Sequence, residues 1–124
     1  MATITELSGH RMLRVDEADD TLATVRDFTD LIGDAMSENV WLVAIPAERL
    51  ADDFYWLRSG LAGEVLQKFV NYRIKLAIIG DVSKWAAESN AFRDLLIELE
   101  RGTDVIVAVD IAALERRLAS VPAA

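Results

Sequence analysis

Cysteine is absent from this 124-residue chain, and there is only one histidine, His10. The chain therefore has no disulfide framework, no thiol nucleophile and no second imidazole for a histidine-rich metal site. No apolar run approaches the roughly 20 residues of a membrane-spanning helix, and the first residues lack the pattern of a signal peptide. We therefore expect a cytoplasmic protein that needs no membrane, metal or cofactor.

Basic residues are scarce, because 13 lysines and arginines stand against 21 aspartates and glutamates, for a formal net charge of −8. Such a charge makes nucleic acid a poor partner. The imbalance is uneven: residues 41–80 hold five bases and four acids, whereas residues 1–40 hold three bases and nine acids. Hydrophobic residues make up 52% of the chain, which argues against disorder, and the length fits one domain over residues 1–124.

Motifs of catalysis and nucleotide binding are missing as well. The chain contains no Walker motif and neither a Gly-x-Gly-x-x-Gly nor a Gly-x-Ser-x-Gly pattern. His10 falls in a predicted hairpin turn, where a solvated imidazole is usual. We name no catalytic residue, and the sequence favours a non-enzymatic role.

Strand and helix patterns alternate along the chain. A β-hairpin is predicted for residues 3–15, with Ser8-Gly9 as its turn. Continuous apolar runs predict strands that are buried on both faces, as in a parallel sheet. These runs are residues 40–45, 76–79 and 105–109, and the helical stripes between and after them begin at Leu22, Leu61, Phe92 and Ile111. The predicted order is β-β-α-β-α-β-α-β-α, an α/β fold with a mixed, mostly parallel five-stranded sheet.

Several residues are predicted to shape these elements. Gly102 is placed to end the third helix in left-handed geometry, and Asp110 to cap the last helix. The aromatic run Phe54-Tyr55-Trp56 lies in a long connection, where it either packs beneath the chain or anchors an interface. We expect Trp41 in the core and leave Trp85 open between core and rim.

The segment from Arg58 to Gly63 is predicted to begin the second long helix. Its two glycines leave the first helix amides open to an anion, and Arg58 could bind a carboxylate or phosphate through two hydrogen bonds. The alternative is that Ser59 is an ordinary N-cap and the glycines allow close packing. Our candidate surface for a protein partner or an anion consists of Phe54, Tyr55, Trp56, Arg58, Ser59, Gly60 and Gly63.

Charged residues mark two further places. Asp81 and Asp110 each follow a predicted buried strand, and ligands in open α/β sheets bind beyond the carboxyl ends of strands. The two aspartates could therefore line a crevice, although helix capping explains them as well. Lys68, Arg73 and Lys75 gather where the second long helix meets the next strand; the helix dipole accounts for them, and the alternative is an acidic docking partner.

The order of elements and the segment Leu57–Gly63 resemble the STAS domain, the fold of bacterial anti-anti-sigma factors. STAS domains carry an Asp-Ser-Ser-Gly-Leu-Gly-like stretch at the start of the corresponding helix, and residues 92–118 look like the helix-strand-helix end of that domain. The resemblance implies a STAS-like fold and regulation through a protein partner. Arg58 stands where the phosphorylated serine usually lies and Leu57 replaces the acid, so a phosphorylation switch is not implied.

Residues 60–81 resemble a bacterial family known as domain of unknown function 4180. The stretch that carries this resemblance reads GLAGEVLQKFVNYRIKLAIIGD. It implies no mechanism. We therefore predict a non-enzymatic regulatory or protein-interaction module with an unknown protein partner. The alternative is a small-molecule or anion-binding sensor, or a weak enzyme, using the crevice at the strand carboxyl ends. The chain could form a homodimer through an apolar patch, or it could remain a monomer.

Overall fold

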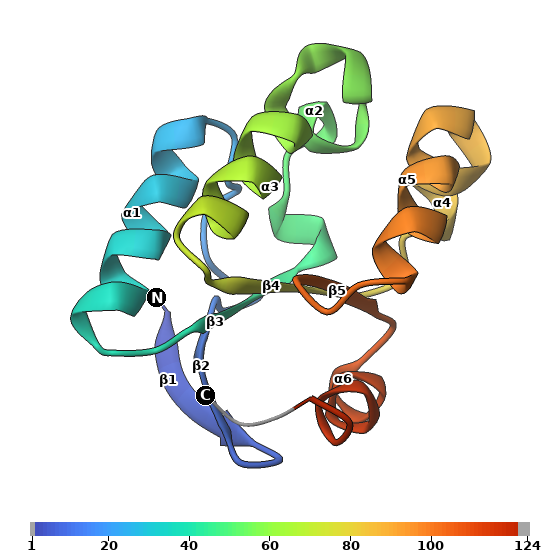
Figure 1. Ribbon diagram of the computed structural model, residues 1–124. Coiled ribbons are helices and arrows are strands. Elements are labelled where there is room, and N and C mark those ends of the chain that lie inside the picture. The colour runs from blue at the N-terminus through green and yellow to red at the C-terminus, as the bar shows by residue number, and fades with distance from the viewer. Residues whose placement is uncertain (1, 122–124) are drawn as a thin grey trace.

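A five-stranded sheet with helices on both faces forms the frame of the computed structural model, which describes residues 2–121 (Figure 1). The strands are β1 (Thr3–Leu7), β2 (His10–Arg14), β3 (Leu42–Pro46), β4 (Lys75–Ile79) and β5 (Val105–Ala108). The helices are α1 (Val25–Ser37), α2 (Asp52–Tyr55), α3 (Leu61–Asn71), α4 (Ser83–Glu88), α5 (Asn90–Glu100) and α6 (Ile111–Leu118), with two 3-10 turns, η1 (Ala47–Arg49) and η2 (Leu57–Ser59). The strands lie in chain order, β1 antiparallel to β2 and all others parallel. This confirms the predicted mixed, mostly parallel α/β fold.

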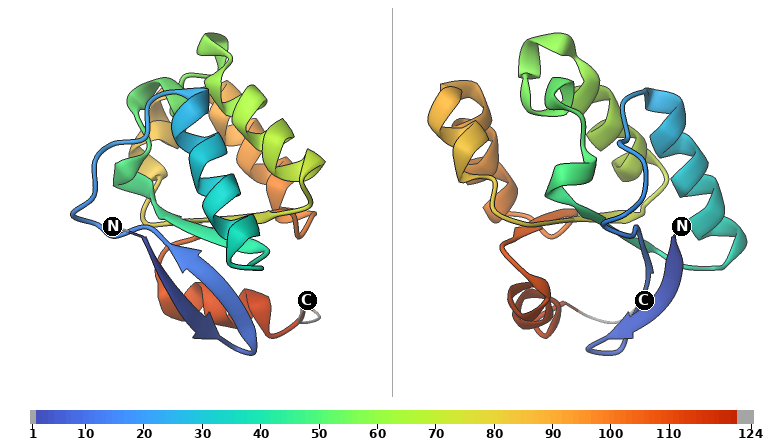
Figure 2. Two further views of the ribbon diagram at one scale, coloured as in Figure 1. Left: turned by 90° about the vertical axis from the view of Figure 1, so that its left-hand side faces the viewer. Right: turned by 180° about the vertical axis from the view of Figure 1, so that it is seen from behind.

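Both faces of the sheet are covered, which explains the continuous apolar runs in the sequence. In β3, Val43 and Ile45 point into the larger core, which contains apolar side chains of α1, α3 and α5. Leu42 and Ala44 point to the opposite face and pack with α6. Figure 2 shows α1 to α5 on one side of β3, β4 and β5 and α6 on the other side, toward which the β1–β2 edge of the sheet bends. Alternate residues of one strand therefore meet different apolar layers, so no position is left for a polar residue.

The helices α1 and α3 end in the same way before they lead into β3 and β4. Each is followed by one residue in the left-handed region, Asn39 with φ 58° and Arg73 with φ 57°. The next residues, Val40 and Ile74, are buried, and their amides donate to the helix carbonyl five residues earlier at 2.8 and 3.0 Å. Such a bond closes a Schellman turn, where glycine or asparagine is usual. Arginine at position 73 is therefore conformationally unfavourable.

The long connection packs against the carboxyl end of β4. Gly80 has φ 144°, and a Cβ at this position would lie only 2.9 Å from the Cβ of Ala47 in η1. The Tyr55 hydroxyl donates to the Ala47 carbonyl at 2.6 Å, and its ring stacks on Trp85 with centroids 3.9 Å apart. Burial, and then the nearby acids, raise the pKa of Tyr55. The end of β4 is thus covered by η1, whereas Val109 and Asp110 after β5 are exposed.

The structure corrects several predictions of local structure. The helix α4 was not predicted, because its six residues are too few to show a clear apolar stripe. Gly102 follows α5 as expected, but its φ is not positive, so the prediction of left-handed geometry is wrong. Trp41 is 37% exposed and not in the core, whereas Trp85 is buried. Among the helices of residues 2–121, none has both the length and the hydrophobicity to cross a membrane.

Candidate functional site

The predicted surface around Arg58 is only partly exposed. Phe54 and Tyr55 are 1% and 2% exposed, so they belong to the core and cannot contribute to an accessible surface. Their burial follows from the long connection, which folds back over the sheet and places them near Phe28 and Trp85. Trp56, by contrast, is 60% exposed.

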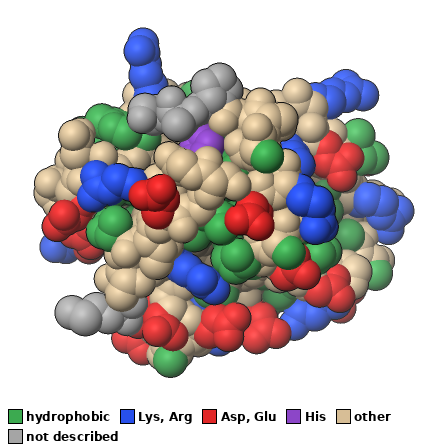
Figure 3. All heavy atoms as spheres, turned by 90° about the horizontal axis from the view of Figure 1, so that it is seen from below, with side chains coloured by type: hydrophobic (Ala, Val, Ile, Leu, Met, Phe, Trp, Pro, Cys, Tyr) green, Lys and Arg blue, Asp and Glu red, His purple; other side chains and the backbone are tan. Residues whose placement is uncertain are grey.

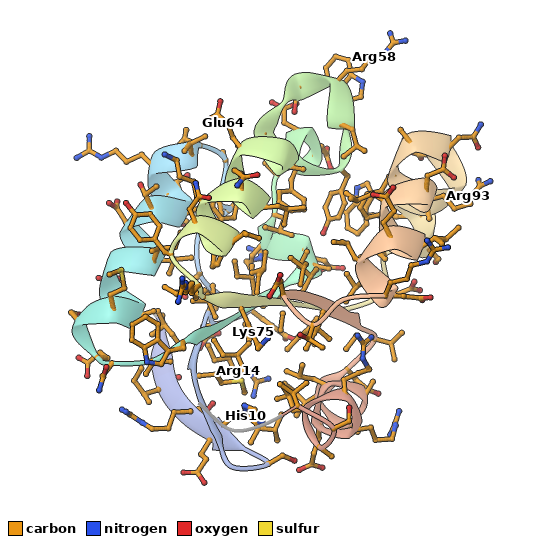
Figure 4. The ribbon with its side chains drawn as sticks, in the orientation of Figure 1. His10, Arg14, Arg58, Glu64, Lys75 and Arg93 are labelled. Atoms are coloured by element: carbon orange, nitrogen blue, oxygen red, sulfur yellow. The ribbon has the colours of Figure 1, made fainter. Side chains whose placement is uncertain are left out.

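The turn that leads into α3 is built differently from the predicted N-cap. Gly60, with φ 82°, occupies the cap position, so the alternative that Ser59 is an ordinary N-cap is wrong. The Ser59 hydroxyl donates to the Asp53 carbonyl at 2.6 Å and accepts a hydrogen bond from the Leu61 amide at 3.2 Å. It thereby fixes an exposed corner, from which Arg58 points away from the molecule (Figure 4). We call residues 56–60 the Trp56 corner.

Both strand-end aspartates accept a hydrogen bond from the backbone that follows them, but only Asp110 is a helix N-cap. Asp81 accepts a hydrogen bond from the Ser83 amide at 2.9 Å, and Asp110 caps α6 by accepting from the Ala113 amide at 2.8 Å. The hydrogen bonds from Ser83 lower the pKa of Asp81. Within residues 2–121 there is no group of three or more potential metal-ligating side chains. The capping interpretation is therefore confirmed for Asp110, whereas Asp81 accepts within the turn that precedes α4, whose N-cap is Val82.

A cavity lies at the opposite end of the sheet, where β3 and β4 begin. Its volume is about 1000 Å³, at the upper end of the range of small-molecule pockets. We call it the strand-start cavity; its walls are residues 9–11, 39–42, 69–70, 73–75 and 104. The turns after α1 and α3 form much of its rim, so the left-handed residues Asn39 and Arg73 both face this site.

Positive charge dominates the walls of the strand-start cavity. Arg11 and Arg73 are exposed, and neither guanidinium has a hydrogen-bond or ion-pair partner among the described residues. Lys75 is held in place, since its Nζ donates to the carbonyl and hydroxyl of Thr103 at 3.0 and 3.2 Å and lies 4.0 Å from the Asp104 carboxylate. Three cations thus face one carboxylate, in a protein whose net charge is −8.

Apolar side chains form the rest of the cavity. Trp41 and Val70 are 37% and 45% exposed, and both line the cavity. Phe69 is buried behind them. A wall of this kind favours an apolar ligand body, while the cations favour a negative charge at one end.

The comparisons with known proteins give the family of the chain. Residues 7–118 match the model of the family described as Domain of unknown function (DUF4180). The chain belongs to this family. No curated protein and no solved structure matches it. Membership of the DUF4180 family confirms the resemblance seen in residues 60–81, whereas the likeness to the STAS fold stays a prediction.

The single histidine of this DUF4180 member is not where the sequence analysis expected it. His10 begins β2 and is 7% exposed, so the prediction of a solvated side chain is wrong. Its Nε2 donates to the Val121 carbonyl at 3.0 Å. The two residues meet because the β1–β2 edge of the sheet bends toward the end of α6 (Figures 2 and 4). Figure 3 shows the molecule from below, where acidic and basic side chains surround scattered apolar side chains.

Of the residues that line the strand-start cavity, the sequence analysis grouped only Arg73 and Lys75, as part of a cluster of basic residues. The cluster that contains Arg73 and Lys75 was noticed, but the helix dipole explained it sufficiently. Arg11 and Trp41 gave no signal, because they come from other turns and reach the site only when the parallel strands align. That Arg73 occupies a left-handed position, where glycine is usual, became evident only from the structure.

Proposed function

We propose that this protein is a non-enzymatic binding module, which holds an organic anion with an apolar body in the strand-start cavity. The observation that carries the proposal is the pair of unpartnered guanidinium groups, Arg11 and Arg73, beside an exposed tryptophan in an acidic protein. The proposal keeps the predicted alternative of an anion-binding sensor, but moves the site from the carboxyl ends to the amino ends of the strands.

The energetic argument rests on the difference between charged and neutral ligands. A hydrogen bond to a charged group contributes about 1.5–3 kcal/mol, and the planar guanidinium of Arg73 can hold both oxygens of a carboxylate. Lys75 adds a cation whose position is already fixed by Thr103, so little of its conformational entropy remains to be lost on binding. Trp41 would cover the apolar body of the ligand.

An NMR titration with 2-naphthoate tests the proposal, with neutral 2-naphthalenemethanol as its uncharged analogue. We expect saturable shifts of the Trp41 indole N–H and of the amides of Arg73 and Lys75. The neutral analogue should bind at least about tenfold more weakly, which corresponds to about 1.4 kcal/mol. Saturable binding that shifts only other parts of the chain, or no binding, would overturn the proposal.

Two arginine variants at opposite ends of α3 make the test specific. Arg73→Asn removes the charge but keeps a residue that tolerates left-handed geometry, so the turn should remain intact. Arg58→Gln is the matched control, since the helix between them is 11 residues, or about 16 Å, long. We expect Arg73→Asn alone to weaken naphthoate binding, by about tenfold. A loss confined to Arg58→Gln would instead favour an anion site at the Trp56 corner.

A second candidate function is docking of a protein partner at the Trp56 corner, as the sequence analysis proposed. The observation that favours it is the 60% exposure of Trp56 beside the exposed Arg58. Exposed tryptophan and arginine are typical anchors of interfaces. A partner that copurifies with the wild type should be lost with Trp56→Ala and with Arg58→Glu, and retained with Arg116→Glu on α6. Equal recovery of the purified partner by all variants would count against this surface.

A further inference from the structure

A shallow groove between α3 and α5 adjoins the strand-start cavity. Its volume is about 250 Å³, and we call it the α3–α5 groove; it is lined by residues 63, 66–67, 70, 98–99, 102 and 104–105. Val70 and Asp104 line both the groove and the cavity. The two hollows therefore adjoin at these residues, and the lining of the groove extends along α3 as far as Gly63.

The groove offers an apolar path along α3. Leu66 and Val70 are four residues apart and so lie on the same face of the helix, and Leu99 of α5 lies opposite them. At the far end, Gly63 has no side chain, and a Cβ added there would meet nothing within 4 Å. From Gly63 to Asn71, the last residue of α3, the helix rises by eight residues, or about 12 Å, and Arg73 follows two residues later. A long linear ligand could span this distance.

We infer that the ligand of this protein is a linear aliphatic carboxylate, with its head at Arg11, Arg73 and Lys75 and its hydrocarbon chain in the α3–α5 groove. This inference rests on the proposed function and adds the shape of the ligand. The charges favour this orientation: Glu98 on the groove repels a carboxylate, whereas the cavity holds three cations and one carboxylate, that of Asp104, which lies 4.0 Å from Lys75. A compact aromatic anion would leave the groove empty.

Binding of a series of straight-chain acids tests the inference. Hexanoate, octanoate, decanoate and dodecanoate are titrated separately, each below its micelle concentration. In the wild type we expect the affinity to rise about two- to fourfold with each added methylene, because each buried methylene adds hydrophobic free energy. Methyl decanoate keeps the chain and loses the charge, so it should bind at least tenfold more weakly than decanoate.

The variant Gly63→Leu fills the far end of the groove. We expect it to abolish the gain in affinity between octanoate and dodecanoate, while binding of hexanoate and 2-naphthoate stays within twofold of the wild type. The variant should fold, since leucine is a better helix former than glycine and a Cβ finds free space. Gly33→Leu on α1 is the matched control, because Gly33 also lies in a helix with nothing within 4 Å.

Two results would overturn the inference. One is an affinity that does not change with chain length; the other is a Gly63→Leu variant that gains from longer chains as the wild type does. If 2-naphthoate still binds in the strand-start cavity, only the inference about the chain fails. If neither naphthoate nor any of the acids binds there, the proposed function fails with it.

Discussion

The left-handed residue at the end of α3 allows a direct test of the turn that forms the candidate site. Arg73 has φ 57°, its side chain is exposed, and its guanidinium has no partner among the described residues. Replacing it with glycine or with alanine removes the same side-chain charge, and hence the same interaction with the helix dipole. The two variants then differ only in their backbone preferences.

The expected difference follows from two opposing effects. A residue with a Cβ loses about 1–2 kcal/mol in left-handed geometry, and glycine avoids this cost. Glycine in turn gains about 0.4–1 kcal/mol of conformational freedom in the unfolded chain. We therefore expect Arg73→Gly to be about 0.5–1 kcal/mol more stable than Arg73→Ala.

Urea denaturation, followed by circular dichroism with the m-values compared, measures this difference. The control pair is Gln67→Gly and Gln67→Ala in the interior of α3, where both variants lose the same bond from Gln67 to Asn71. At that position alanine should be the more stable by about 1 kcal/mol, so the sign reverses. If alanine is at least as stable as glycine at position 73, the left-handed turn is wrong, and with it the geometry of the cavity rim.

Two further predictions concern other parts of the fold. Gly80→Ala should destabilise the protein by more than about 2 kcal/mol, because its Cβ would approach the Cβ of Ala47 to 2.9 Å at φ 144°; an unchanged denaturation midpoint would contradict the packing of η1 over β4. Hydrogen bonds from the amides of Ala23 and Thr24 lower the pKa of Asp27 below its ordinary 3.8, so its stabilising effect is present at neutral pH and lost as the pH falls through the lowered pKa. The difference in unfolding free energy between wild type and Asp27→Ala, about 1 kcal/mol at pH 7, should therefore shrink below about pH 4, and a difference that stays constant to pH 2 would refute this.

The elements of the fold were largely predictable because their signals are local. Three apolar runs without alternation predicted strands covered on both faces, and the structure places the alternate residues of β3 in two separate cores. Asp110 was recognised as a cap because a cap depends only on the next three residues. The prediction failed for α4, whose short length gives no periodic signal, and for His10, whose burial depends on the distant Val121.

The candidate site was less predictable, because it is assembled from turns far apart in the chain. The sequence by itself determined which segments become strands and helices, the family, and the gathering of basic residues near Arg73, since each depends on neighbours in the chain. Only the tertiary structure decided that η1 packs against the end of β4 and that Arg11, Trp41 and Lys75 meet at the amino end of the sheet. The physical reason is that parallel pairing of β2, β3 and β4 aligns the starts of these strands, and no local pattern records which side chains then share a cavity.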